Sequence, residues 1–320
     1  MSSHTHTHTT VLLAETIANL AIKESGIYID ATFGRGGHSQ AILERLGPQG
    51  RLMAIDVDSE AIAVAKKAPF LSDTRFEIEQ ASFSQLEALI SKRGWLGKID
   101  GVLLDLGVSS PQLDDPLRGF SFLREGPLDM RMNPEQGIDA MTWINQAAAS
   151  EIADVLFQYG EERFSRRIAR AIVSSREVTR IETTTQLAKI IEKANPKKEK
   201  HKHPATRSFQ AIRIYINQEL TALNDCLPQM VNVLKTGGRL CVISFHSLED
   251  RMVKQFIQYE SSNDIFPAHL PITEAQLKQM QHARLKKIGK SIKPSDEEIQ
   301  QNPRARSARL RVAERVWSKK

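Results

Sequence analysis

A glycine-rich turn and two aspartates follow short apolar runs near the start of the chain. The turn, Asp30-Ala-Thr-Phe-Gly34-Arg-Gly36-Gly37-His38, comes after the apolar run 27–29, and Asp56 ends a second apolar run, 52–55. Because glycine has no Cβ, such a turn lets the backbone bend sharply and lie against an adenosine moiety. A carboxylate about twenty residues after the turn is placed to accept hydrogen bonds from both ribose hydroxyls. The pattern indicates a nucleotide-type pocket that includes Gly36, Gly37 and Asp56.

The charge of Asp30 distinguishes between two kinds of nucleotide cofactor. A dinucleotide brings a negatively charged pyrophosphate, which Asp30 would repel. S-adenosylmethionine (SAM) has no phosphate and carries an ammonium and a sulfonium, which a carboxylate at the end of the first strand attracts. Asp30 therefore favours a methyl donor, and the alternative is a plain strand-to-helix turn with no ligand.

The elements that must position these residues alternate between strand and helix in the first third of the chain. We expect strands at 27–30, 51–56, 76–80 and 99–106, and helices at about 39–46, 59–68 and 84–93. This alternation predicts an α/β fold, with a parallel sheet that has helices on both faces.

The alternation stops after Gln112. Residues 111–136 are rich in Pro, Gly and Asp, which predicts a long ordered loop, and helical stretches follow at roughly 140–158, 161–175, 184–194 and 207–225. The alternation of helix and strand then resumes, with a helix at 228–235, a buried strand at 239–244 and a helix from Phe245. The basic-apolar alternation after Pro303 is typical of an edge strand. We therefore expect one domain from 1–112 and 216–320, and an inserted loop and helical subdomain at 113–215.

Composition and charge narrow the class of protein. The net charge of +6 is unevenly distributed: 284–320 has twelve Lys or Arg against four acids, and 163–213 has fourteen against four. Two basic blocks on an otherwise acidic chain are typical of a protein that binds a polyanion, although solvated helix faces also explain the middle block. Two cysteines and the lack of a membrane-length apolar run or signal peptide indicate a reducing, cytoplasmic location and no membrane partner.

Several other polar and aromatic residues are candidates, each with a structural alternative. Phe83 follows the third strand, where its ring could cover an adenine or pack in the core, and Asp105 ends the fourth strand, where ligands gather in such folds. His246 could be a general base, stack on a base or cap the following helix. Arg131, Arg213 and Asn217 could hold RNA or form structural contacts. The His4, His6 and His8 leader has a spacing compatible with a metal site, but it lies at a terminus without neighbouring acids or cysteines, so we expect no metal.

Six motifs in order carry a resemblance to one family. They are the glycine turn from Asp30 to His38, Asp105-Leu-Gly-Val-Ser-Ser-Pro-Gln-Leu-Asp, Gly126-Pro-Leu-Asp-Met-Arg-Met, His203-Pro-Ala-Thr-Arg, Ile243-Ser-Phe-His-Ser-Leu-Glu-Asp-Arg and Asn302-Pro-Arg-Ala-Arg-Ser. From about His8 to Arg315, the chain resembles the bacterial MraW family of ribosomal RNA small subunit methyltransferases. The residues before His8 depart from that family.

The resemblance implies a class I SAM-dependent methyltransferase: a Rossmann-like, doubly wound, mostly parallel sheet with a helical insertion that helps to hold RNA. It implies methylation of N4 of a cytosine in the decoding (P-site) region of 16S rRNA, with 16S rRNA as partner, in the small ribosomal subunit. It places SAM contacts on Gly36, Gly37, His38, Asp56, Phe83, Asp105 and Gln112. From the residues themselves, Arg131, Arg213, Asn217, Arg304 and Arg306 are our candidates for RNA contacts.

The chemistry of an amino methyltransferase directs attention to Asp105. Many such enzymes follow an acid or amide residue with Pro-Pro-aromatic, whereas here Leu106-Gly107-Val108 follows Asp105. We expect oxygens near Asp105 to orient the amine, with His246 as a weaker candidate. Methylation at C5 of cytosine would instead need a cysteine nucleophile. A nicotinamide-dependent oxidoreductase and a noncatalytic RNA-binding protein with an inactive SAM pocket are the alternative functions.

Overall fold

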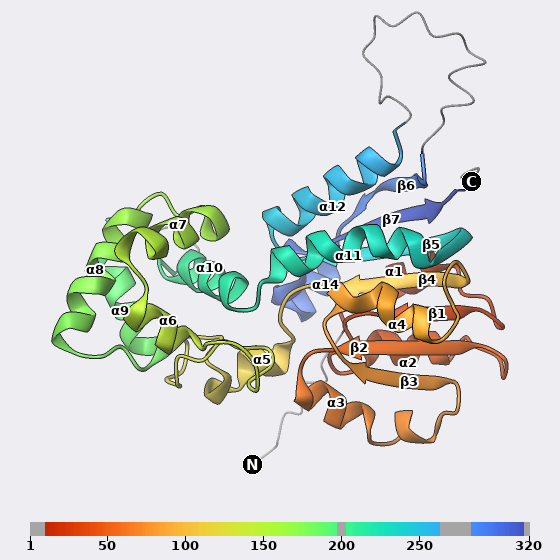
Figure 1. The fold of residues 1–320 in the computed structure, drawn as a ribbon, viewed down its shortest axis with the longest axis horizontal. Helices are drawn as coiled ribbons and strands as arrows, with labels where there is room; N and C mark the ends of the chain where they lie inside the picture. Colours follow the sequence, from red (N-terminus) through yellow and green to blue (C-terminus); the bar gives the residue numbers. More distant parts are fainter. Residues whose placement is uncertain (1–9, 197–202, 263–282, 317–320) are drawn as a thin grey trace, which may run out of the picture. The chain divides into compact units, whose positions relative to one another are not determined.

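The computed structural model describes residues 10–196, 203–262 and 283–316. These residues divide between two compact units, one within Met1–Gly107 and Thr221–Lys320, the other Val108–Leu220. Within the described residues, no helix is both long and apolar enough to cross a membrane. Figure 1 shows the elements of both units in sequence colours.

The first unit is built on a seven-stranded sheet in the order β3-β2-β1-β4-β5-β7-β6. The first five strands in this order are parallel, β7 runs antiparallel to β5, and β6 runs antiparallel to β7. The strands are β1 (Ile27–Asp30), β2 (Arg51–Asp56), β3 (Phe76–Gln80), β4 (Ile99–Asp105), β5 (Leu234–Ser244), β6 (Leu285–Ile292) and β7 (Arg309–Arg315). The α/β, mostly parallel architecture expected from the alternation is confirmed.

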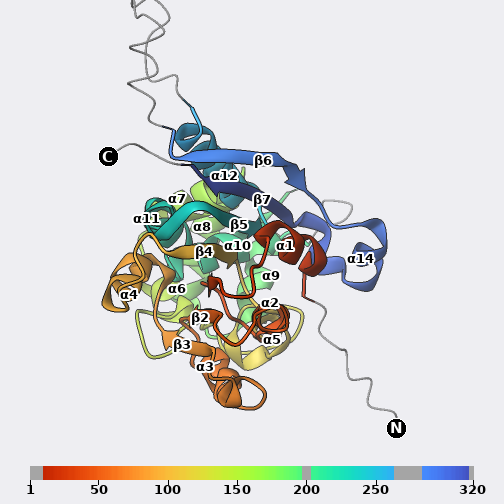
Figure 2. The same ribbon diagram turned by 90° about the vertical axis from the view of Figure 1, so that its right-hand side faces the viewer.

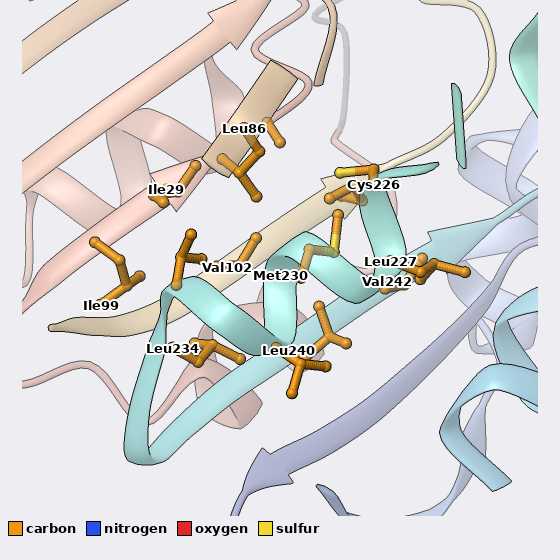
Figure 3. Close-up of a cluster of buried hydrophobic side chains, with 14 of the residues drawn as sticks. Ile29, Leu86, Ile99, Val102, Cys226, Leu227, Met230, Leu234, Leu240 and Val242 are labelled. Atoms are coloured by element: carbon orange, nitrogen blue, oxygen red, sulfur yellow. The ribbon is translucent and has the colours of Figure 1, made fainter. Parts of the chain in front are cut away.

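Helices cover both faces of this sheet because neighbouring residues of a strand point to opposite faces. Ile29 and Met53 pack in one apolar cluster with α4 (Leu86–Lys92), α11 (Glu219–Val233) and α12 (Ser247–Glu260). Figure 3 shows part of this cluster, with Met230 near Val102 and Leu227 near Val242.

The adjacent strand residues Tyr28 and Leu52 belong to the cluster on the other face. Three helices supply its helical side: α1 (Leu13–Leu20), α2 (Gly37–Leu43) and α3 (Ser59–Ala65). The short helix α14 (Asp296–Gln301) precedes the last strand. Both faces of β1, β2 and β4 are therefore largely buried, which explains why these strands are mainly apolar runs.

The second unit is helical and has its own core, which includes Trp143, Leu156 and Phe209. Its helices are α5 (Ser110–Asp114), α6 (Ala140–Gln146), α7 (Ala149–Gly160), α8 (Ser165–Val178), α9 (Thr184–Ala194) and α10 (Thr206–Ile216). The side chains of Asp139 and Thr183 cap α6 and α9 by accepting backbone N–H bonds.

Three expectations about the chain after residue 206 are wrong. The tail strand, β7, is not at the edge, because it pairs with β5 on one side and with β6 on the other. The helical stretch expected at 207–225 is interrupted at Gln218, whose φ of 51° is left-handed, and α11 then continues through Pro228 to Val233. β5 begins at Leu234, so the last two residues of the helix expected at 228–235 belong to a strand.

Candidate active site

Three buried or partly buried aspartates end neighbouring parallel strands in the first unit. Asp30 ends β1, Asp56 ends β2 and Asp105 ends β4, and these strands are adjacent in the order β2-β1-β4. The carboxyl ends of parallel strands lie at one edge of the sheet, which is where α/β folds bind ligands. The three acids therefore line one edge, as the apolar runs in the sequence predicted.

Asp30 lies in the interior, with 1% of its surface exposed. One carboxylate oxygen accepts a hydrogen bond of 2.7 Å from the Ser39 hydroxyl, and the other accepts one of 3.2 Å from the Thr32 amide. Burial, opposed by these bonds and reinforced by the charge of Asp56, raises the pKa of Asp30 to about 6. Ionisation of Asp30 therefore destabilises the folded protein when no ligand is bound.

Asp56 connects the second strand to the glycine turn. Its Oδ2 accepts a bond of 2.7 Å from the Gly34 amide and its Oδ1 one of 2.9 Å from the Asp58 amide. Burial raises its pKa despite these bonds. The carboxylate expected to bind ribose hydroxyls therefore also holds the turn beside which an adenosine would lie.

The glycines of the turn are required for different reasons. Gly34 has φ of 57°, and a Cβ added there would meet nothing within 4 Å. Gly36 has φ of 80°, and its Cβ would lie 2.5 Å from the Phe70 ring and 2.7 Å from the Phe33 ring. A Cβ at Gly37 would collide with the Thr10 side chain. Open space beside the turn thus occurs at Gly34, whereas neighbouring side chains leave no room for a Cβ at Gly36 or Gly37. The SAM contacts expected at Gly36 and Gly37 stay a prediction.

Asp105 and His38 face each other at the end of the fourth strand. The Asp105 amide donates a bond of 2.6 Å to the Thr32 hydroxyl, and its Oδ2 lies 3.7 Å from Nδ1 of His38. Burial together with the charges of Asp30 and Glu249 raises the pKa of Asp105 well above its usual range. Burial lowers the pKa of His38 to about 4. His38 is therefore neutral at pH 7 and does not supply a positive charge to Asp105.

Two buried polar atoms of this pair lack a hydrogen-bond partner among the described residues. They are Oδ1 of Asp105 and Nε2 of His38. Buried polar groups are normally satisfied, so each unsatisfied atom calls for an explanation. A ligand with polar groups at this edge would supply the partners.

His246 begins the helix after β5 and caps it. Its Nδ1 accepts a bond of 3.4 Å from the Glu249 amide, while a carboxylate oxygen of Glu249 accepts bonds from the amides of Phe245 and His246. This reciprocal arrangement is a capping box. The helix-cap alternative for His246 is confirmed, and a catalytic role for His246 stays a prediction.

Glu249 itself was not recognised from the sequence. It is 2% exposed, and its charge contributes to the raised pKa of Asp105. The spacing His246-Ser-Leu-Glu249 contains the signal for it, because an acid three residues after a capping residue is typical of a capping box.

Phe83 and Gln112 have structural roles in different units. Phe83 begins a short 3₁₀ turn after β3 and packs, partly buried, against the core. Gln112 belongs to the second unit, where its Oε1 accepts a bond of 2.8 Å from the Ser109 amide at the start of α5. The positions of Phe83 and Gln112 neither support nor exclude contacts with SAM, so these contacts remain predictions.

The polar candidates for RNA in the second unit all have internal partners. Arg131 forms an ion pair of 2.7 Å with Asp129, and Arg213 donates two bonds of 2.8 Å to Glu219. Asn217 accepts from the Met132 amide and donates to the carbonyls of Met130 and Arg213. These contacts are the structural alternative named for each of them, and RNA contacts at these residues stay predictions.

The remaining candidates lie near the end of the chain or outside the described residues. Arg304 and Arg306 are both exposed, in the 3₁₀ segment Pro303–Ser307. His4, His6 and His8 lie outside the described residues.

Taken together, the edge has an excess of negative charge. No lysine or arginine among residues 10–196, 203–262 and 283–316 forms an ion pair with Asp30, Asp56 or Asp105, and His38 is held neutral. Each of these carboxyls has a raised pKa, so the protein alone does not compensate their charge. Such an edge is complementary to a cation and repels a pyrophosphate.

The fold and this edge define the class of protein: a Rossmann-like α/β sheet of the kind found in class I SAM-dependent methyltransferases. The chain belongs to the MraW methylase family, whose model matches residues 5–316.

Named relatives agree with this assignment. A "Ribosomal RNA small subunit methyltransferase H" of Coxiella burnetii is 58% identical over 309 residues, which cover 97% of this chain and 99% of that protein. A protein of the same name from Hydrogenovibrio crunogenus is 58% identical over 310 residues, 97% of this chain and 96% of its own. Among solved structures, a SAM-dependent O-methyltransferase of Thermotoga maritima matches with a TM-score of 0.40 and 10% identity, covering 96% of this chain and 66% of that one; this similarity is too low to support an inference.

Proposed function

We propose that the protein transfers a methyl group from SAM to N4 of a cytosine in the P-site region of 16S rRNA. The observation that carries this proposal is the cluster of uncompensated carboxylates, Asp30, Asp56 and Asp105, at the carboxyl edge of the sheet, beside a glycine turn that has open space at Gly34. The names of the relatives support a substrate in the small ribosomal subunit.

The residues at the edge fit SAM better than a dinucleotide. Asp30 and Asp105 provide negative charge for an ammonium and a sulfonium, and Asp56 is placed for ribose hydroxyls. A pyrophosphate would add negative charge beside three carboxyls whose pKa values are already raised by burial. The oxidoreductase alternative is disfavoured for this reason.

When bound, SAM supplies an electrophilic methyl carbon on a sulfonium. The protein must hold the cytosine amino group in line with that carbon, so positioning provides much of the rate. The free Oδ1 of Asp105 is suited to accept a hydrogen bond from the amino group, which directs the nitrogen lone pair. The amino nitrogen that accepts the methyl group would have a proton to lose, which the Asp105 carboxylate could accept or pass to water.

The cysteines support nitrogen rather than carbon as the target atom. Cys226 and Cys241, the two cysteines of the chain, are both fully buried. Burial raises the pKa of both thiols, that of Cys241 to about 12. Neither is available as the thiolate nucleophile that methylation of cytosine C5 requires.

We assign RNA recognition to the helical unit and to the basic C-terminal block. The helical unit contains the basic stretch 163–213, and Arg304 and Arg306 are exposed in the C-terminal block. A base within folded RNA must leave its stack before it can react, so we expect the target cytosine to be splayed out. We expect the reaction to take place in the cytoplasm.

Nucleoside mass spectrometry of 16S rRNA tests this proposal in cells. A deletion strain should lose N4-methylation of the target cytosine, the wild-type gene should restore it, and a gene encoding Asp105→Asn should restore it poorly. Persistence of the modification in the deletion strain would overturn the proposal.

A further inference from the structure

A cavity of about 500 Å³ lies in the first unit between α12 and the two antiparallel strands. Its walls come from the second half of α12, from β6 and from the middle of β7. Figures 1 and 2 both show α12 beside β6. β6 is the edge strand opposite β3, and the cavity is lined by none of the carboxylates of the candidate active site.

Every ionisable residue that lines this cavity is basic: Lys254, Lys287, Lys290 and Arg311. Arg311 is neutralised by Asp250, to which it donates bonds of 2.7 and 3.0 Å. The three lysines are exposed, and none forms an ion pair with another described residue. The cavity therefore has three uncompensated positive charges.

A bulge in the edge strand adds polar groups to the cavity wall. Ile288 pairs with Val312 and Ile292 with Leu310, so the residues 289–291 stand opposite Arg311 alone. Gly289 in this bulge has φ of 63°, and a Cβ there would meet nothing within 4 Å. Residues of a bulge do not pair regularly with the neighbouring strand, and a segment of this kind can present backbone N–H groups to a ligand.

One side chain in the wall lacks a partner. The hydroxyl oxygen of Ser261 is buried and has no hydrogen-bond partner among the described residues. A buried hydroxyl beside three free ammonium groups and a strand bulge is a donor set suited to phosphate oxygens, with the lysines acting as point charges.

We propose that this cavity binds phosphate groups of the RNA strand and provides a second contact with the substrate, away from the methyl-transfer edge. The inference rests on the proposed function for the identity of the polyanion. Lysines on an edge strand also prevent edge-to-edge aggregation. That role, however, requires neither a cavity nor a lysine contributed by the facing helix, as Lys254 is.

The test compares two triple variants of the full-length protein. The first, Lys254→Gln, Lys287→Gln and Lys290→Gln, removes the three charges of the cavity. The control, Lys66→Gln, Lys67→Gln and Lys92→Gln, removes three exposed lysines that follow α3 or end α4, toward the opposite edge of the same sheet. Filter binding measures the Kd for an unmethylated 16S rRNA fragment at several salt concentrations, and calorimetry measures SAM binding.

The cavity variant should bind the RNA about tenfold more weakly or worse near 0.1 M salt. Its plot of log K against log salt should be shallower by about two to three, since each lost phosphate contact contributes roughly 0.7 to 0.9 to the slope. SAM affinity should not change, which also shows that the variant is folded. The control should resemble the wild type.

Equal RNA affinity and salt slope in the two triple variants would overturn the inference, as would loss of binding to inorganic phosphate without any change in RNA binding. Failure of the wild-type protein itself to bind SAM or to methylate the fragment would instead overturn the proposed function. The two failures are therefore distinguishable.

Discussion

Replacing Asp30 with Asn should stabilise the ligand-free protein and weaken its binding of SAM. Burial raises the pKa of Asp30 from 3.8 to about 6, and each unit corresponds to about 1.36 kcal/mol. At pH 7 the ionised carboxylate thus costs the folded state about 3 kcal/mol, an upper value for the gain from Asp30→Asn. An Asn side chain can still accept a bond from the Thr32 amide and donate one to the Ser39 hydroxyl.

The pH dependence has a definite sign. Because the folded-state pKa of Asp30 is raised, the folded protein retains this proton more tightly than the unfolded chain. The contribution of Asp30 to stability is fully present below about pH 4 and is lost as the pH rises through about 6. Urea unfolding of the ligand-free protein at pH 5 and pH 7 should show a smaller loss of stability across this interval in Asp30→Asn than in the wild type.

Ligand binding distinguishes charge from shape. Calorimetry should show that Asp30→Asn binds SAM at least tenfold more weakly, but binds methylthioadenosine, which has neither the sulfonium nor the ammonium, about as well as the wild type. Asp100→Asn is the matched control, because Asp100 is buried near the other end of β4 and pairs with Lys23 and Lys235. That variant should be less stable and should bind SAM normally when folded. Equal weakening of both ligands by Asp30→Asn, or a less stable ligand-free protein at pH 7, would refute the electrostatic reasoning.

Three further predictions concern the same edge. Asp105→Asn should lower turnover by about a hundredfold or more and weaken SAM binding, as measured by single-turnover methylation and calorimetry, and full retention of both would remove Asp105 from the mechanism. His246→Ala should cost about 1 kcal/mol of stability because the helix loses its cap. His246→Asn, which preserves a capping side chain, should retain both stability and turnover. Loss of turnover in a stable His246→Asn variant would instead indicate catalysis by the imidazole. Gly34→Ala should cost about 1 to 2 kcal/mol from backbone strain alone, and Gly36→Ala should cost more because its Cβ also meets two phenylalanine rings, an order that urea unfolding can check.

The parallel part of the fold was predictable because burial on both faces requires continuous apolar runs. The strands ending at Asp30, Asp56 and Asp105 are such runs, and the polar residue after each run marks the carboxyl edge. The positions of these three acids along one edge therefore followed from the sequence.

The edge strand β6 was not predicted, because three of its eight residues are exposed lysines and it lacks an apolar run. Without β6, the tail strand β7 was expected at the edge. The helix break at Gln218 has no glycine to mark it, and the helices expected at 207–225 and 228–235 were separated where α11 continues through Pro228. These features depend on tertiary packing rather than on local preference.

The roles of individual polar residues were harder to predict than their positions. Asn217 resembles a surface RNA contact in the sequence, yet in the structure its amide satisfies the backbone at Met130 and Met132, which are more than eighty residues earlier in the chain. Single-sequence patterns do not reveal such long-range partners. The pKa of Asp105 is likewise raised first by its own burial, and then by the charges of Asp30 and of Glu249 in a later helix.

The most direct test of the central claim is a transfer experiment with purified protein. Small-subunit particles or 16S rRNA that lack the modification are incubated with SAM deuterated in its methyl group, and the digested nucleosides are analysed by mass spectrometry. We predict that the label appears in N4-methylcytidine at one P-site position and that Asp105→Asn greatly reduces it. Label in C5-methylcytidine, or no label in rRNA from a protein that binds SAM, would contradict the account.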